Sequence, residues 1–332
     1  MKLHDFDYTL PQERIAQYPL KDRSRAKLLV LKRTTAEIIH SVFSDIYRFL
    51  SKGDVLVIND TKVFKARLRG KKKTGGSVEI LLIKEQAPGV WEAMISHAKR
   101  IKEETQIFLK QGTYATVQEK HGSRCLLTFN NDVQNIISSV GSVPLPHYIK
   151  REPVRHDEEY YQAVFAKKRG SIAAPTASLH FTNALLKSIE AQGVDIAEIT
   201  LHIGPGTFKS IRSENIEDHV MESEFFEINE RTIAQIENAR RTIAVGTSVC
   251  RALETFAQTS TTCGQADLFI YPGYQFKIVD GLVTNFHLPC STPLLLVSAF
   301  AGRTAVLDAY ATAIEQKYRF LSYGDAMLIT DS

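Results

Sequence analysis

The sequence predicts an α/β fold with a mostly parallel sheet covered by helices, and a smaller antiparallel β-barrel domain inserted into it. Strand-like apolar runs such as Val55–Ile58 alternate with helical patterns in the outer parts of the chain, as parallel sheets require. Between Val78 and Phe129 the pattern changes to short β-rich runs separated by turn residues, typical of a barrel or small sandwich. The stiff segment Val143–Ile149, with its two prolines, then marks the return.

The chain has 332 residues, enough for two domains. We expect a discontinuous α/β catalytic domain of residues 1–65 and 151–332, and a barrel domain of residues 66–150. The barrel strands are predicted at Val78–Ile83, Val90–Ser96, Gln106–Leu109, Tyr114–Val117 and Arg124–Phe129. A helix over residues 133–140 follows them and ends at Gly141.

Composition bounds the class of protein. No apolar run approaches the roughly 20 residues of a membrane helix, and Met1–Phe6 lacks an apolar signal core, so we expect a cytoplasmic protein without membrane contact. The four cysteines are scattered, which favours free thiols over disulfides or a metal site. A net charge of +4 permits an acidic partner such as RNA. We expect a monomer.

Polar residues follow the first buried strand at its C-terminal end. Val55–Ile58 is apolar throughout, and Asn59, Asp60, Thr61 and Lys62 come directly after it. Ligands of open α/β sheets bind beyond the carboxyl ends of the strands, which makes these residues candidates for substrate binding. An Asx turn is the alternative.

A run of positive charge, Arg67–Lys73, lies between these residues and the first predicted barrel strand. A solvated hairpin tip is the favoured interpretation. A patch that contacts phosphates is the alternative.

The segment Gly170–Thr182 is rich in Gly, Ala, Ser and Thr and precedes a helix with Leu185 and Ile189 on one face. Thr182 is a candidate N-cap for that helix. The loop therefore brings His180 to a helix N-terminus, which favours negative charge. The alternative is a tight connector in which His180 is merely packed. We expect His180 and the Asn59–Lys62 turn to line the same pocket.

Two further segments carry candidate acid–base groups. A predicted strand, Val194–Leu201, leads to His202 in a glycine turn, although a lone histidine is more often structural. Asp218–Glu224 then places three carboxylates around His219. Neighbouring carboxylates can separate their pKa values for acid–base work, and an exposed acidic helix is the alternative.

The last third of the chain repeats the alternation of strands and helices. Strands are predicted at Thr242–Val245, Asp267–Tyr271 and Leu282–Phe286, and helices from Ser248 to Phe256, around Leu294–Phe300 and over Val306–Tyr318.

Several motifs together resemble the S-adenosylmethionine:tRNA ribosyltransferase-isomerase family of queuosine biosynthesis. They are Ala173-Ala174-Pro175-Thr176-Ala177 before Leu179-His180-Phe181, then Thr284-Asn285-Phe286-His287-Leu288-Pro289, and finally the segment from Tyr318 to Met327. Other matching segments extend over nearly the whole chain in the order of the family.

The resemblance implies that the ribosyl part of S-adenosylmethionine is transferred and isomerised onto 7-aminomethyl-7-deazaguanine at the wobble position of a tRNA. The products would be epoxyqueuosine-tRNA, adenine and methionine. S-adenosylmethionine would be a consumed co-substrate, with no cofactor and no metal.

Candidate roles follow from the matched segments. Proton transfer is assigned to His180, His202, His219 and Glu224. Arg67, Arg251 and Arg319 are candidates for the methionine carboxylate or tRNA phosphates, since Arg forms bidentate pairs with both. Substrate binding is further assigned to Asn59, Asp60, Thr61, Lys62, Thr176, Thr247, Asn285, His287, Tyr323 and Asp325.

The chain departs from the family pattern at Ser178, Ser210, Glu222 and Cys290. Glu222 stands where the family usually has His, and a Glu222 that faced the pocket would favour protonated His219. The alternative function is therefore a catalytically impaired tRNA-binding homologue of the same fold. A methyltransferase is a weaker rival, because the sequence lacks the glycine-rich first turn that such a fold needs.

Overall fold

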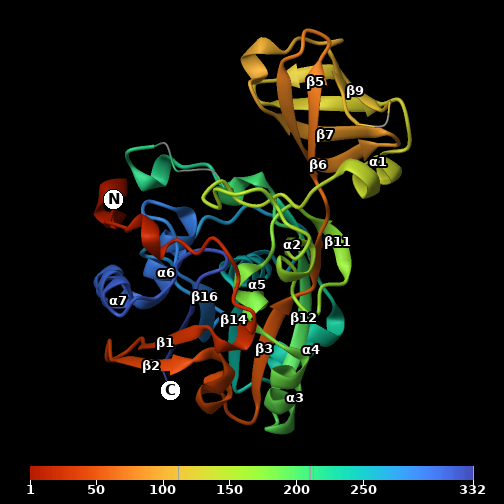
Figure 1. Cartoon of the computed structure of the whole chain (residues 1–332). Helices are drawn as coiled ribbons and strands as arrows, with labels where there is room; N and C mark the ends of the chain where they lie inside the picture. Colours follow the sequence, from red (N-terminus) through yellow and green to blue (C-terminus); the bar gives the residue numbers. More distant parts are fainter. Residues whose placement is uncertain (111, 209–210, 212, 332) are drawn as a thin grey trace.

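A computed structural model gives the fold, and it describes residues 1–110, 112–208, 211 and 213–331. Figure 1 shows an α/β part with a separate barrel at the top of the view. In the described residues nine strands form one sheet, in the order β15-β13-β12-β3-β14-β16-β17-β1-β2. The predicted fold class, an α/β part with an inserted antiparallel barrel, is confirmed.

The centre of the sheet is parallel. It consists of β12 (Asp195–Leu201), β3 (Asp54–Asn59), β14 (Arg241–Val245) and β16 (Gly281–Asn285). All residues of β3 and β16 are buried, which explains the apolar stretches Val55–Ile58 and Leu282–Val283 at their centres. Their carboxyl ends therefore lie along one edge.

The outer strands make the sheet mixed. β17 (Ala326–Thr330) is antiparallel to β16 and parallel to β1 (Lys27–Lys32). Antiparallel pairing also occurs at the two ends of the sheet. The edge strand β2 (Ile38–Val42) pairs antiparallel with β1, and at the other end β13 (Glu224–Ile228) pairs antiparallel with both β12 and the edge strand β15 (Cys263–Ala266). The parallel order that the sequence predicts thus holds for the centre.

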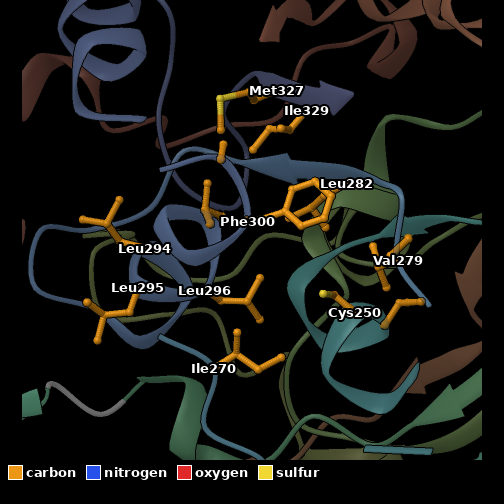
Figure 2. Close-up of a cluster of buried hydrophobic side chains, with 14 of the residues drawn as sticks. Cys250, Ile270, Val279, Leu282, Leu294, Leu295, Leu296, Phe300, Met327 and Ile329 are labelled. Atoms are coloured by element: carbon orange, nitrogen blue, oxygen red, sulfur yellow. The ribbon is translucent and has the colours of Figure 1, made fainter. Parts of the chain in front are cut away.

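Helices cover both faces of this sheet. On one face α5 (Thr247–Thr259), α6 (Thr292–Ala301) and α7 (Arg303–Glu315) contribute to the largest core cluster. Figure 2 shows part of that cluster, where Leu294 and Phe300 of α6 lie with Leu282 and Met327 of the sheet. On the other face α3 (Asn183–Ala191) packs with a 3-10 helix, Phe43–Phe49. The remaining helices are α1 (Val133–Val140), α2 (Asp157–Tyr160), α4 (Glu230–Glu237) and short 3-10 turns at Leu3–Phe6, Gln12–Arg14, Arg23–Arg25, Ala98–Arg100, Thr176–His180, Pro205–Phe208 and Ile216–Asp218.

The barrel has a core of its own. Its described strands close in the order β10-β7-β6-β5-β8-β9, and alternate residues of β6 and β7 point inward. The strands are β5 (Arg67–Lys72), β6 (Ser77–Ala87), β7 (Val90–Ile95), β8 (Gln106–Phe108), β9 (Tyr114–His121) and β10 (Arg124–Phe129). The five predicted strands are confirmed. The favoured interpretation of Arg67–Lys73 is wrong, because most of that run forms strand β5 and only the turn after it is a hairpin tip.

The chain enters and leaves the barrel at one place. Arg67 and Ser142 form an antiparallel bridge, with backbone N–O distances of 3.1 and 2.9 Å. Below it β4 (Thr61–Val63) pairs in parallel with β11 (Lys168–Ser171). The division into residues 1–65 with 151–332, and 66–150, stays a prediction.

One local prediction and one alternative are wrong. Asp267–Tyr271 is not a strand; the strand is β15, directly before it, and this apolar run instead packs beside the core as a loop. Asp218–Glu224 is not an exposed helix, because the chain is extended after Asp218 and β13 begins at Glu224.

No single helix of the described chain is long and apolar enough to cross a membrane. By length and composition alone α6 and α7 pass together as a pair bent by 114°.

Candidate active site

A cavity of about 430 Å³ lies at the carboxyl edge of the parallel strands. The loop that contains Pro175 and Thr176 lines it, together with the ends of β14 and β16 and the first residues of α5 and α6. The strand ends and helix starts of α/β sheets form ligand sites for this reason. Thr176, Glu224, Thr247, Arg251, Asn285 and His287, all predicted from the sequence, line this cavity.

One end of the cavity contains a buried ion pair. The Arg251 guanidinium donates to a Glu224 carboxylate oxygen, and both side chains are almost fully buried. The other Glu224 oxygen accepts from the Gly204 backbone N–H at 2.8 Å. Burial lowers the pKa of Arg251 to about 10, so the guanidinium is still charged at neutral pH. The pair therefore places a carboxylate and a cation in the lining of the cavity.

The turn Thr284–His287 supplies an imidazole. His287 Nε2 lies 2.8 Å from Thr284 Oγ1. Its backbone is held on both sides, because its N–H donates to Tyr310 OH at 3.1 Å and its carbonyl accepts from Tyr8 OH. Burial lowers the pKa of His287 to about 3, so the ring is neutral at physiological pH and binds a proton only weakly.

Asn285, on the same turn, connects the cavity to His180. Asn285 Nδ2 lies 3.3 Å from both His180 Nε2 and the Leu321 carbonyl oxygen. His180 itself lines a separate, small cavity with Arg23 and Arg319. Burial, and then the charges of these arginines, lower the pKa of His180 to about 3. The predicted catalytic His180 therefore lies behind Asn285, as a neutral ring.

The Asn59–Lys62 turn does not line the same cavity as His180, and that prediction is wrong. The Asn59 side chain is buried and bonds to both backbone groups of Leu201. Asp60 bonds to Thr200 at 2.7 Å and lines another cavity, while Lys62 is exposed. These polar side chains tie β3 and its extension to the neighbouring strand, which is the physical reason for the error.

His202 lies beside the Asn59–Lys62 turn, where it contacts Thr61. Thr61 Oγ1 is 2.8 Å from His202 Nδ1, and the ring stacks on Phe225 with centroids 5.7 Å apart. Burial lowers its pKa. Among the described residues, the lining of the main cavity includes the next residue, Ile203, but not His202. The assignment of proton transfer to His202 thus lacks support from its position.

The structure gives His219 and Glu222 different described partners. His219 packs on Phe269, whose ring centroid is 5.0 Å away, and burial lowers the pKa of His219 rather than raising it. Glu222 pairs instead with Arg124 of barrel strand β10, at 3.0 Å. This ion pair joins the loop before β13 to the barrel.

The remaining candidates are engaged in the fold. Arg67 Nη2 donates to the Leu145 carbonyl at 2.9 Å. Asp325 accepts from the Arg319 and Lys27 backbone N–H groups at 2.7 and 3.0 Å. Tyr323 OH donates to buried Asp157 at 2.7 Å. Of the departures from the family pattern, Ser178 is buried, Cys290 lines the main cavity, and Ser210 falls outside the described residues.

Sequence reasoning missed two tyrosines of the main cavity. Tyr148 OH lies 2.5 Å from Ser322 Oγ. Tyr161 is 1% exposed. Tyr148 stands in the proline-containing segment that the sequence marks as a connector, whereas no sequence signal distinguishes Tyr161.

Comparisons with known proteins agree with this architecture. A family model described as "Queuosine biosynthesis protein" matches residues 3–329. Relatives named S-adenosylmethionine:tRNA ribosyltransferase-isomerase are 48% identical in a Sulfurihydrogenibium species and 47% in Halothermothrix orenii; each alignment covers 99% of this chain and 100% of the relative. A crystal structure of S-adenosylmethionine tRNA ribosyltransferase from Thermotoga maritima has a TM-score of 0.57 and 35% identity, covering 98% of this chain and 99% of that one. The chain therefore belongs to the queuosine biosynthesis protein family.

Proposed function

We propose that this chain is an S-adenosylmethionine:tRNA ribosyltransferase-isomerase. It transfers and isomerises the ribosyl part of S-adenosylmethionine onto 7-aminomethyl-7-deazaguanine at the tRNA wobble position. The observation that carries the proposal is the main cavity, where a buried Glu224–Arg251 pair and the neutral His287 line a space of about 430 Å³. The full-length relatives, which carry that name, support it.

The cavity suits the chemistry. The sulfonium of S-adenosylmethionine acidifies the C5′ hydrogens, so a positioned acceptor can remove one as a proton. Glu224 is the acceptor that we assign, because its carboxylate lines the cavity. Adenine leaves with a proton as its glycosidic bond breaks. The aminomethyl nitrogen bonds to the opened ribosyl carbon skeleton and gives up a proton, and closure of the epoxide breaks the bond from carbon to sulfur and expels methionine. S-adenosylmethionine is consumed as a co-substrate.

The two alternatives receive less support. Glu222 pairs with Arg124 and is not among the described residues that line the cavity. Its departure from the family pattern therefore removes no lining group, which disfavours a catalytically impaired tRNA-binding homologue. Nothing in the cavity particularly favours methyl transfer. A cytoplasmic location and a monomeric state stay predictions.

The test is product analysis. Purified protein is incubated with S-adenosylmethionine and a tRNA that carries 7-aminomethyl-7-deazaguanine at the wobble position. Free adenine and methionine are expected in equal amounts. S-adenosylhomocysteine would indicate methylation instead, and binding of tRNA without turnover would indicate the impaired homologue.

Glu224→Gln tests the role of the buried carboxylate, with Glu227→Gln on the same strand as the matched control. Glu227 pairs with exposed Lys168 at 2.7 Å, away from the main cavity. Loss of a positioned proton acceptor costs typically about 100- to 10,000-fold in rate. We expect such a loss of adenine release for Glu224→Gln only; equal rates in both variants would contradict the assignment.

A further inference from the structure

Tyr18 is a large aromatic side chain that the fold leaves exposed. It follows the 3-10 turn Gln12–Arg14, and 60% of its surface is accessible to solvent. Within the described part of the chain, the Arg151 guanidinium lies over its ring, with Cζ 4.2 Å from the ring centroid. Since a guanidinium covers a single face of a ring, so large an exposed fraction leaves the opposite face open.

The arginine under this ring is fixed in place. Arg151 Nη1 and Nη2 donate to the two carboxylate oxygens of Asp157 at 2.6 and 2.8 Å, and Nε donates to the Gln17 carbonyl at 2.8 Å. Asp157 is 1% exposed and also accepts from Tyr323 OH. A buried carboxylate is costly to leave without its cation. The Tyr18 ring therefore lies on a rigid, positively charged support.

Tyr18 lies beside the opening of the main cavity. The side chain of the preceding residue, Gln17, donates to the Tyr148 carbonyl at 2.9 Å and accepts from the Lys150 N–H at 2.7 Å. His147 and Tyr148 line the cavity, and His147 is exposed. The hydrogen bonds of Gln17 thus hold Tyr18 next to the solvent-facing part of the lining.

An open aromatic face on a cationic support suits an unpaired base. Stacking on an aromatic ring tolerates any base, because every base has a π-face. Proteins read single-stranded RNA loops mainly by stacking splayed bases on aromatic rings and guanidinium planes. The wobble nucleotide lies in such a loop. When its base enters the cavity, the adjacent base loses a stacking partner and lies outside the opening.

A protein partner fits this surface less well. Protein interfaces use contiguous apolar patches, whereas the side chains that hold this segment, Gln17 and Arg151, are polar and charged, as is the neighbouring exposed Lys150.

We propose that Tyr18 is the platform on which a base adjacent to the wobble nucleotide of the tRNA stacks, with Arg151 as the support of the ring. The inference rests on the proposed function and adds to it a surface that holds the anticodon loop.

Titration with tRNA that carries 7-aminomethyl-7-deazaguanine at the wobble position tests the proposal. Tyr18→Ala should weaken the binding of this tRNA by about 5- to 150-fold, the range of one stack between a base and an aromatic ring. Tyr18→Phe keeps the ring and should bind as the unaltered protein does. Phe108→Ala is the control, because Phe108 is 40% exposed on barrel strand β8. S-adenosylmethionine should bind all variants equally. A Tyr18→Ala variant with unchanged affinity for tRNA would overturn the proposal.

The stacked base is identified with tRNAs that lack one base, on either the 5′ or the 3′ side of the wobble nucleotide. Removal of the base that stacks should weaken binding to the unaltered protein as much as Tyr18→Ala does. The two changes together should then add little. Losses that add fully for both tRNAs would refute the stack.

The salt dependence separates stacking from a phosphate contact. Loss of a phosphate contact reduces the slope of log affinity against log salt concentration. Tyr18 is uncharged, so Tyr18→Ala should leave this slope unchanged, and a reduced slope would contradict stacking.

The proposed function and this inference fail separately. If the unaltered protein binds the tRNA but releases no adenine, the proposed function fails and the titrations still decide the inference. If adenine is released while Tyr18→Ala keeps the KM for tRNA, only the inference fails.

Discussion

Gly170 in β11 has no room for a side chain, which makes its substitution a sharp test of the packing beside the site. A Cβ built on Gly170 would lie 2.5 Å from His202 Nε2 and 2.6 Å from two ring carbons. The ring cannot move freely, because Thr61 holds its other nitrogen at 2.8 Å and Phe225 stacks on it. Gly170→Ala must therefore displace His202 or the strand.

The expected loss follows from these contacts. Overpacking typically costs about 1–3 kcal/mol, and the His202–Thr61 hydrogen bond contributes about 1 kcal/mol if it breaks. We expect Gly170→Ala to lower the free energy of unfolding by about 2–3 kcal/mol. The backbone of Gly170 is not in the left-handed region, so the loss comes from the clash alone.

Urea unfolding followed by circular dichroism measures this loss, with Gly264→Ala in β15 as the control. A Cβ there meets its nearest atom at an ordinary 3.4 Å, and we expect a change within about 0.5 kcal/mol. In a His202→Ala background the clash disappears, so Gly170→Ala should then cost little. A Gly170→Ala variant as stable as the unaltered protein, or a cost that persists without His202, would refute the packing argument.

Three further predictions concern the helix and loops around the site. The pKa of His180 is about 3 when folded but about 6.5 when unfolded, so the unfolded chain binds the proton first and stability falls below about pH 6.5 by up to about 1.4 kcal/mol per pH unit. His180→Gln should lose less stability than the unaltered protein between about pH 7.5 and about pH 5.5; equal losses in chemical denaturation would contradict this. Glu222→His removes the partly exposed ion pair with Arg124, worth about 0.2–1 kcal/mol, and should leave the pH profile of adenine release unchanged, whereas a shifted profile would place Glu222 in the reaction. Thr182→Ala removes the cap of α3 and should cost about 1 kcal/mol, against less than about 0.5 kcal/mol for exposed Ser188→Ala; similar melting temperatures for the two would refute the capping role.

Local signals made the barrel predictable. Each of its strands alternates inward and outward residues between turn glycines such as Gly89 and Gly122, which have positive φ angles. β1 and β17 escaped prediction. They pair with each other from opposite ends of the chain, with Leu29 opposite Met327, although β1 also pairs with the next strand, β2. An apolar run far from its partner carries no pairing signal of its own.

The site was predictable to the extent that strand ends mark it. Asn285 ends β16, His287 and Thr247 follow β16 and β14, and all three line the cavity. Asn59 follows β3 in the same way, but its side chain pairs with the backbone of Leu201. The rule for strand ends predicts at which edge of the sheet a ligand binds. Whether a polar side chain at that edge faces the cavity or bonds to the backbone depends on neighbours that only the tertiary structure brings near. Tyr161 was unpredictable for the same reason.

The bridge between Arg67 and Ser142 has a consequence for the order of folding. The cost of bringing two chain positions together grows with the logarithm of the length between them, and the whole barrel separates β4 from β11. Once the barrel has folded, its two ends meet in a single antiparallel bridge. The remaining chain is then closed as if by a short hairpin, which lowers the effective contact order of the sheet. Early folding of the barrel would thus accelerate assembly of the half of the molecule that contains the cavity.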